Sequence, residues 1–276
     1  NMKIIFMGTP EFSATVLTAL LNSDYEIAAV ITNPDAPVGR KQILTSSPIK
    51  VLAEKNKIPI IKLEEIQEDA DLAIVAAYGK IIPKHILDIP RYGTINVHPS
   101  LLPKYRGASP IQNAILNGDK KTGVTIMKLD EEMDHGPILA QEEFPIATSD
   151  TSESLSQKLA ILGAEFLVKT IPDCISGKIK PVEQNHSEAT FTKIIKKEDG
   201  KINWSKSATE IERMVRAFYP WPTAWTIWNG KILKILEAEV CNEKLAIKKL
   251  QLEGGKILSI KEFLNGHKDF NMARLK

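Results

Sequence analysis

An amide and an imidazole stand two residues apart in the sequence, at Asn96 and His98. The residues around them, Thr94 to His98, have the composition of a β-strand, so the two side chains point to the same face. Pro99 ends this strand, because proline cannot donate to a sheet ladder. An amide can stabilise a developing oxyanion, and an imidazole can move a proton near neutral pH. Such a short pair is also common as a structural feature, so it becomes informative only with a third partner.

A carboxylate that could be this partner is Asp134, in the acidic run from Asp130 to Asp134. The run follows a strand expected at residues 124–127, so it can emerge at the same edge of a sheet as His98. A carboxylate beside an imidazole stabilises the charged ring and fixes its tautomer, which gives a usable acid–base pair. The same residues could equally form a solvated acidic loop, and the sequence does not by itself bring Asp134 to His98.

The elements that must position these residues alternate between strands and helices in the first half of the chain. Short apolar runs predict strands at residues 3–7, 27–32, 71–77, 94–98 and 124–127. Helical patterns are found at residues 11–22, 47–55 and 152–174. Apolar strands that alternate with helices predict an α/β fold with a mostly parallel sheet covered on both faces. In such sheets a ligand binds beyond the carboxyl ends of the strands.

The pattern changes near residue 180. The polar residues 181–200 are predicted as a linker between a domain of residues 1–180 and a second domain of residues 201–276. In the second domain a capping box, Ser207 to Glu210, opens a helix. Short strand-like runs with Asn-Gly and Gly-Gly turns follow, and they predict a small β-barrel or sandwich.

The composition excludes several classes of protein. A content of 43% hydrophobic and 25% charged residues is typical of globular chains. The longest apolar run, residues 72–78, is far shorter than the roughly 20 residues of a membrane span. Two cysteines cannot form a disulfide framework or a four-thiolate metal site. The loop Gly8-Thr9-Pro10 lacks a dinucleotide fingerprint, which disfavours nicotinamide dehydrogenases, and no P-loop is present. We therefore expect a cytoplasmic protein that uses no metal and contacts no membrane.

The charge is distributed unevenly along the chain. Residues 1–200 contain 22 Lys and Arg against 26 Asp and Glu, a balance of −4, whereas residues 201–276 contain 14 against 8, a balance of +6. A basic end on an acidic body indicates an anionic partner that meets the C-terminal part. A solvated, lysine-rich surface would give the same balance.

Several motifs, taken together, resemble the methionyl-tRNA formyltransferase family within the folate-dependent formyltransferases. The motifs span nearly the whole chain, at residues 6–12, 34–40, 47–50, 77–83, 95–110, 122–127, 134, 202–204 and 216–222. The resemblance implies a Rossmann-like, doubly wound catalytic domain followed by a small OB-like β-barrel. It also implies transfer of a formyl group from 10-formyltetrahydrofolate to the α-amino group of methionyl initiator tRNA. We expect the protein to act as a monomer.

The resemblance assigns roles to particular residues of this chain. It implies a catalytic set of Asn96, His98 and Asp134. The residues implied to bind the folate are Ser100, Leu101, Leu102, Pro103, Ile82 and Asp130. The residues implied to contact tRNA are Arg40 and Lys41, in the loop of residues 34–45, with Arg213, Arg216 and Lys231 as further candidates.

Other acceptors remain open, because the Asn-x-His, Ser-Leu-Leu-Pro and Asp elements are specific for the reaction and not for its acceptor. The same chemistry would serve an N-formyltransferase that acts on a nucleotide-linked amino sugar, or a 10-formyltetrahydrofolate hydrolase. The loop at Asp35 to Arg40 and the Trp221-Pro222 pair favour the tRNA enzyme. A non-catalytic tRNA- or folate-binding module is disfavoured, because all three polar site residues are present. The second domain looks short for the family, so we expect its barrel to be incomplete or closed by residues 263–276.

Overall fold

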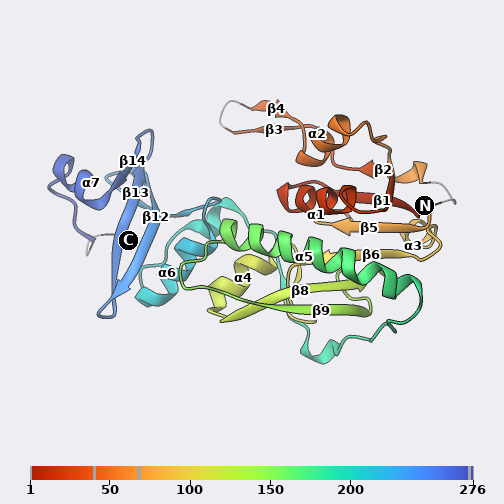
Figure 1. Ribbon diagram of the computed structural model, residues 1–276. Helices are drawn as coiled ribbons and strands as arrows, with labels where there is room; N and C mark the ends of the chain where they lie inside the picture. The colour runs from red at the N-terminus through yellow and green to blue at the C-terminus, as the bar shows by residue number, and fades with distance from the viewer. Residues whose placement is uncertain (1, 40–41, 67–69, 273–274, 276) are drawn as a thin grey trace. The chain divides into compact units, whose positions relative to one another are not determined.

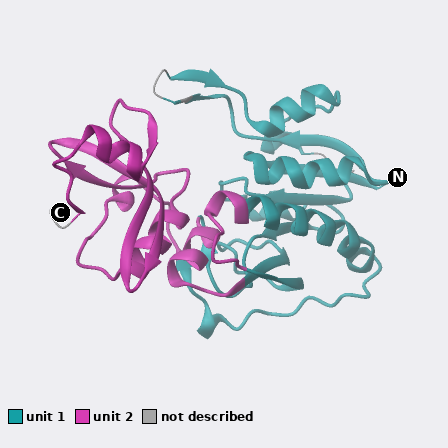
Figure 2. Ribbon diagram, turned by 60° about the vertical axis from the view of Figure 1, so that its left-hand side comes forward, with its two compact units in different colours: residues 1–108, 122–145, 156–191 teal, residues 109–121, 146–155, 192–276 magenta. Residues whose placement is uncertain are grey.

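The computed structural model describes residues 2–39, 42–66, 70–272 and 275, which form two compact units (Figures 1 and 2). The first unit consists of residues up to 108, 122–145 and 156–191, and the second of residues 109–121, 146–155 and 192–276. The chain therefore leaves the first unit and re-enters it twice before it continues into the C-terminal part. The sequence predicts domain boundaries at residues 180 and 200. These boundaries differ from the limits of the two compact units and remain a prediction.

A six-stranded sheet organises the first unit. Its strands are β1 (Lys3–Gly8), β2 (Glu26–Ile31), β5 (Leu72–Ala76), β6 (Thr94–His98), β8 (Lys121–Lys128) and β9 (Ile138–Pro145), in the order β2-β1-β5-β6-β8-β9. β1 is parallel to β2 and β5, and β5 is parallel to β6, whereas β6 and β8 are antiparallel. The predicted α/β fold with a mostly parallel sheet is thus confirmed.

Helices cover this sheet. They are α1 (Glu11–Leu21), α2 (Pro48–Lys55), α3 (Lys84–Leu87), α5 (Ser152–Ile175) and the short 3₁₀ turns η1 (Leu63–Glu65) and η2 (His186–Glu188). α2 starts at Pro48 because the Ser47 hydroxyl accepts the Lys50 N–H at 3.0 Å. α5 packs closely on the sheet at Gly163, where a Cβ atom would lie only 2.9 Å from Val97 Cγ1.

The face of the sheet opposite Val97 has its own apolar core. Residues of β1, β2 and β5 meet η1 and α3 there, and the buried members are Ile5, Met7, Ala29, Ile31, Ile66, Ala70, Ala73, Val75, Tyr78, Ile82, Ile86 and Leu87. All five residues of β5 and all five of β6 are buried, so both faces of these strands are shielded from water, as the uninterrupted apolar sequence of β5 requires.

Several elements of the first unit lie outside the sequence prediction. β9 has the exposed polar residues Gln141, Glu142 and Glu143 near its centre, so it lacks the apolar pattern of a buried strand and stands at the edge of the sheet. The loop predicted at residues 34–45 instead contains a hairpin, β3 (Ala36–Val38) with β4 (Ile43–Thr45). A two-stranded sheet joins β7 (Arg106–Gly107) to β10 (Phe191–Thr192).

The second unit contains a four-stranded antiparallel sheet. Its strands are β11 (Ala224–Trp228), β12 (Lys231–Cys241), β13 (Lys244–Leu252) and β14 (Ile257–Ser259). Its helices are α4 (Pro110–Asn117), η3 (Lys197–Gly200), α6 (Ala208–Ala217) and α7 (Ile260–Gly266). α6 begins at the predicted capping box, in which the Ser207 hydroxyl accepts the Glu210 N–H and the Glu210 carboxylate accepts the Ser207 N–H.

The second unit confirms the predicted small β-domain, and its strand order agrees with the incomplete barrel of the two expected alternatives. The four strands follow one another in an open order, β11-β12-β13-β14. The tail expected to close a barrel instead begins within α7, whose Phe263 packs into the apolar core of this unit with 1% of its surface exposed. In the parts of the chain that the structure describes, no helix has the length and apolar character needed to cross a membrane.

Candidate active site

The carboxyl end of β6 carries Asn96 and His98, as the strand pattern predicts. Both are buried, with 8% and 4% of their surfaces exposed. Asn96 lies opposite Val75 of β5, and His98 lies opposite Thr125 of β8. Because paired residues of a sheet share a face, both side chains lie on the side of the Val75 core and not on the side of α5. Pairing with strands on both sides therefore fixes where these two groups sit.

The structure brings Asp134 to both of them. Its Oδ1 atom lies 3.4 Å from the Asn96 Nδ2 donor and 3.6 Å from His98 Nδ1. Its Oδ2 atom accepts the Gly107 N–H at 2.7 Å. The sequence left it open whether Asp134 reaches His98, and the turn that carries Asp134 folds back over the end of β6 to do so.

Hydrogen bonding determines which atoms of this cluster carry protons. The Tyr105 carbonyl lies 3.0 Å from His98 Nε2 and can only accept, so Nε2 carries a hydrogen. The other ring nitrogen faces the Asp134 carboxylate, which also only accepts. The orientation of the His98 ring is therefore fixed from both sides. Asn96 similarly turns its NH₂ group toward the carboxylate, because its carbonyl oxygen would be repelled there.

The segment Ser100–Pro103, which is predicted to bind folate, is held in place by hydrogen bonds to Thr125 of β8. The Thr125 hydroxyl donates to the Ser100 carbonyl at 2.6 Å and accepts the Leu102 N–H at 3.1 Å. Gln141 of β9 donates to the Leu102 carbonyl at 2.8 Å. Leu102 is buried, whereas Leu101 and Pro103 are half-buried. The segment therefore offers apolar surface, and its central polar groups are already bonded within the protein.

The other two residues predicted at the folate site have clear structural roles. Ile82 is 5% exposed and belongs to the apolar core that also contains Tyr78. Asp130 accepts the Glu132 N–H at 3.0 Å and pairs with His135 Nδ1 at 2.7 Å, which shapes the turn ahead of Asp134. A folate contact of either residue remains a prediction.

Behind the Asp134 turn lies a buried polar group that the sequence did not single out. Arg106 and Gln184 are 3% and 4% exposed, and Arg106 Nε and Nη2 both donate to Gln184 Oε1, at 3.1 and 2.7 Å. Arg106 lies within a motif quoted above, but nothing in its spacing pointed to this contact. Gln184 lies in the polar stretch predicted as a linker, where a single glutamine does not stand out as a candidate site residue.

Two ionisable groups near the carboxyl edge of the sheet have shifted pKa values. Burial, and secondarily the charge of Glu64, raises the pKa of the Tyr78 phenol. A hydrogen bond from Lys50, at 2.8 Å, lowers the pKa of the Asp35 carboxyl. Tyr78 therefore stays neutral and Asp35 stays ionised at neutral pH.

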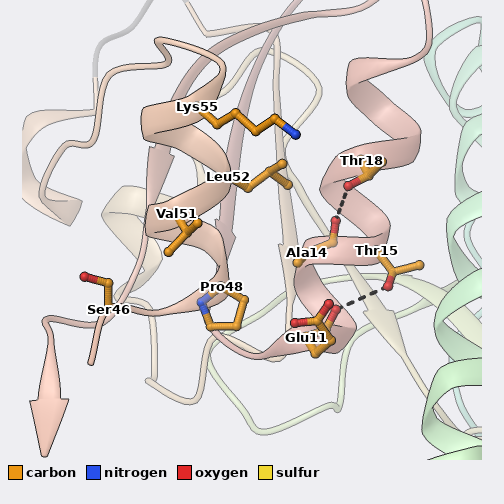
Figure 3. A pocket seen from close by; sticks show the side chains of 9 residues that line it. All are labelled: Glu11, Ala14, Thr15, Thr18, Ser46, Pro48, Val51, Leu52 and Lys55. Carbon is orange, nitrogen blue, oxygen red and sulfur yellow. Dashed lines mark hydrogen bonds between the residues drawn. The ribbon is translucent and has the colours of Figure 1, made fainter. Parts of the chain in front are cut away.

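A hollow lies between α1 and α2 in the first unit (Figure 3). Two of its hydroxyls are already used within α1, since Thr15 donates to the Glu11 carbonyl and Thr18 to the Ala14 carbonyl. The hollow contains none of the candidate site residues, and its lining brings together no group suited to acyl chemistry.

The residues predicted to contact tRNA lie in different parts of the chain, and the structure describes only some of them. Arg40 and Lys41 lie outside the described residues. In the second unit, Arg216 pairs with Glu212 at 2.5 Å and donates to the Asp150 carbonyl at 3.0 Å, so it stabilises the unit itself. The Arg213 guanidinium lies directly over Gly118, where a Cβ atom would be 2.1 Å away. Among the described residues, no group of three or more His, Cys, Asp or Glu side chains is arranged to hold a metal ion.

Comparison with known proteins identifies the family. Residues 2–171 match the family described as formyl transferase, and residues 194–246 match the formyl transferase C-terminal domain. The chain belongs to the formyl transferase family. The family match covers every polar residue of the Asn96–His98–Asp134 cluster, whereas Gln184 lies between the two matched regions.

Two individual formyl transferases are similar to this chain in sequence. The chain is 48% identical over 248 residues to a methionyl-tRNA formyltransferase of Halalkalibacterium halodurans, covering 86% of this chain and 78% of that protein. It is 44% identical over 271 residues to a methionyl-tRNA formyltransferase of Bacillus cereus, covering 95% of this chain and 85% of that protein.

Solved formyl transferase structures include enzymes with different acceptors. WlaRD, a sugar 3N-formyl transferase determined with dTDP and 5-N-formyl-THF, superposes with a TM-score of 0.72 at 26% identity, covering 94% of this chain and 97% of that one. A methionyl-tRNA formyltransferase from Clostridium thermocellum superposes with a TM-score of 0.62 at 20% identity, covering 91% of this chain and 99% of that one. The second likeness shows a shared fold.

Proposed function

We propose that the protein transfers the formyl group of 10-formyltetrahydrofolate to the free α-amino group of methionyl initiator tRNA. The observation that carries the proposal is the buried contact of Asn96, His98 and Asp134 at the carboxyl edge of the sheet, in a member of the formyl transferase family. The identities of 48% and 44% to methionyl-tRNA formyltransferases support this acceptor over others.

The reaction forms a bond between the α-nitrogen and the formyl carbon and breaks the bond from that carbon to N10 of the folate. The attacking amine is neutral, and negative charge develops on the formyl oxygen as it adds. In the proposed mechanism the second hydrogen of the Asn96 amide, the one not directed at Asp134, binds this oxygen. In the same proposal a protonated His98 ring adds electrostatic stabilisation, which burial of the ring strengthens.

A proton must also travel from the α-nitrogen to the departing N10. We assign this transfer to the Asp134–His98 pair. Its two groups are held 3.6 Å apart, and each is oriented by a second backbone contact, at Gly107 for the carboxylate and at Tyr105 for the ring. The reaction is then complete without a covalent enzyme intermediate, because the amine loses one proton and N10 gains one.

The formyl donor suits the surface next to this cluster. Leu101 and Pro103 offer half-buried apolar surface to a flat ring system. Because the central backbone groups of this segment are bonded to Thr125 and Gln141, we expect apolar contact from it and most of the polar recognition of folate from other residues.

The acceptor is proposed to be held outside this cluster, by Arg40 and Lys41 and by the positive balance of residues 201–276. Basic side chains of that kind contact phosphates and splayed end nucleotides of RNA. Arg216 contributes little to such binding, because Glu212 already neutralises it.

The test is transfer of labelled formyl from 10-formyltetrahydrofolate to methionyl initiator tRNA by wild type, His98→Ala and Arg40→Ala. We expect product with wild type, loss of product with His98→Ala, and a raised KM for tRNA with an unchanged KM for folate in Arg40→Ala.

A second acceptor class is favoured by one observation, the structural likeness to the sugar 3N-formyl transferase WlaRD. The same assay therefore includes a nucleotide-linked amino sugar as acceptor and a measurement of released formate. Formylation of the sugar, or release of formate, without product on tRNA would contradict the proposed acceptor.

A further inference from the structure

Asp134 stands in a turn with a left-handed backbone conformation. Its φ angle is +49°, in the left-handed region that is uncommon for non-glycine residues, although Asp adopts it more readily than most. Its side chain contacts Asn96, His98 and Gly107 N, but these contacts hold the carboxylate and not the backbone of the turn. Some other group must fix the peptides on either side of Asp134.

Gln184 supplies that group. Its side-chain Nε2 donates to the Asp134 carbonyl at 2.9 Å and to the Gly136 carbonyl at 2.7 Å, so both amide hydrogens are used on the turn. The turn is also packed closely against the end of β8, because a Cβ atom on Gly136 would lie 2.1 Å from the Lys128 carbonyl. The two ends of the turn are thereby tied to one buried side chain.

Arg106 fixes the orientation of Gln184 in turn. A guanidinium can only donate, so the atom that receives Nε and Nη2 must be the amide oxygen, and the amide nitrogen must face the turn. Arg106 Nη2 also lies 2.8 Å from His186 Nδ1, which acts there as an acceptor. Hydrogen bonds from a charged donor are stronger than those between neutral groups, so this amide cannot easily flip.

The backbone beside Arg106 contacts the front of the same site. Tyr105 O accepts from His98 Nε2, and Gly107 N donates to Asp134 Oδ2. One short segment therefore holds His98 and the Asp134 carboxylate directly, and holds the Asp134 backbone through Gln184. A shift of Gln184 would move the carboxylate relative to a ring that stays in place.

We propose that Arg106 and Gln184 form a clamp, and that Gln184 is a positioning residue that sets the Asp134 carboxylate against His98 and Asn96. The effect of Gln184 on catalysis rests on the proposed function. The geometry of the clamp is the same whichever acceptor the enzyme uses. Groups that orient a catalytic carboxylate from behind affect turnover more than substrate binding.

The decisive variant is Gln184→Glu, because a carboxylate keeps an acceptor for Arg106 but loses both donors to the turn. We expect kcat to fall about 10- to 100-fold, with the KM values of folate and tRNA close to wild type. Gln184→Met, which keeps the volume but bonds to neither partner, serves as a second variant if the first fails to fold. Glu183→Gln, at the exposed neighbouring position, is the matched control and keeps wild-type kcat.

A double variant separates positioning from general destabilisation. If Gln184 acts through Asp134, Gln184→Glu has no further effect on kcat in an Asp134→Asn background. Losses that multiply in the double variant would overturn the proposal, and so would a Gln184→Glu enzyme with wild-type kcat.

A spectroscopic readout keeps this test independent of the acceptor. The ring ¹⁵N shifts of His98 are measured in wild type, Asp134→Asn, Gln184→Glu and Glu183→Gln, and assigned with His98→Asn. We expect Gln184→Glu to move them in the same direction as Asp134→Asn, while Glu183→Gln leaves them unchanged. If wild type fails to formylate tRNA but the shifts move, the proposed function fails and the clamp stands. If the shifts stay fixed in Gln184→Glu, the clamp fails whatever the acceptor.

Discussion

The end of β6 and the turn at Asp134 contribute to the same cluster, but they are held in different ways. β6 is paired with β5 as far as Asn96 and with β8 as far as His98, so the backbone positions of both residues follow from sheet register. The turn is in no sheet, and Asp134 takes its place from a left-handed backbone angle, a backbone N–H and the side chain of a residue 50 positions away. A strand positions a group through local sequence, whereas this turn depends on distant residues, so small changes should affect the two regions very differently.

The largest expected effect comes from removing a reacting group on the strand. Asn96→Ala deletes the proposed oxyanion donor, and we expect single-turnover formyl transfer to slow by about 10²–10³-fold. The thermal midpoint should change little, because the β6 backbone keeps its ladder on both sides. A loss below about tenfold would remove Asn96 from the proposed mechanism.

The next largest effect should come from moving the turn without touching a reacting group. Gly136→Ala puts a Cβ atom 2.1 Å from the Lys128 carbonyl, so the backbone must shift. A misplacement of about 1 Å can cost about 10²-fold in rate, and we expect kcat to fall toward that value. Gly266→Ala, where a Cβ atom meets nothing within 4 Å, is the matched control. Wild-type kcat in Gly136→Ala would show that the turn tolerates movement and that the contrast drawn between β6 and the Asp134 turn is wrong.

A third variant tests the apolar segment beside the cluster. Thr125→Val keeps the shape but removes the hydroxyl that bonds Ser100 and Leu102, leaving a buried N–H unpaired. We expect a stability loss of about 1–3 kcal/mol in urea unfolding and a raised KM for the folate, with a smaller change in kcat. Thr170→Val, which removes only one bond within α5, should leave the KM unchanged. An unchanged KM in Thr125→Val would separate the segment from folate binding.

The smallest effect on activity is expected on the far face of β6. Val97→Ala opens a cavity toward α5 and should cost about 2 kcal/mol of unfolding free energy. Because register and not side-chain packing sets Asn96 and His98, kcat per folded molecule should stay near wild type. A large fall in kcat would mean that the strand, like the turn, relies on its packing partners.

These differences explain what could be predicted from sequence. The strand of Asn96 and His98 was predicted with its observed bounds, because five residues of β-type composition end at a proline. The pairing of Asp134 with His98 could not be derived, because the path of a turn depends on which distant residues it meets. Gln184 gave no signal at all, since its contacts lie 48 to 78 residues away in the chain. β9 was missed for a related reason, because its exposed polar centre hides the pattern of a strand.

The position of Gln184 also affects how this protein can be recombined with its relatives. The matched N-terminal family region ends at residue 171 and includes Asn96, His98 and Asp134, but the clamp residue lies beyond it, in the stretch before the C-terminal family region. A chimera joined at residue 171 would inherit its reacting groups from one parent and their support from the other. A junction placed after residue 191, where the first compact unit ends, would keep both from the same parent.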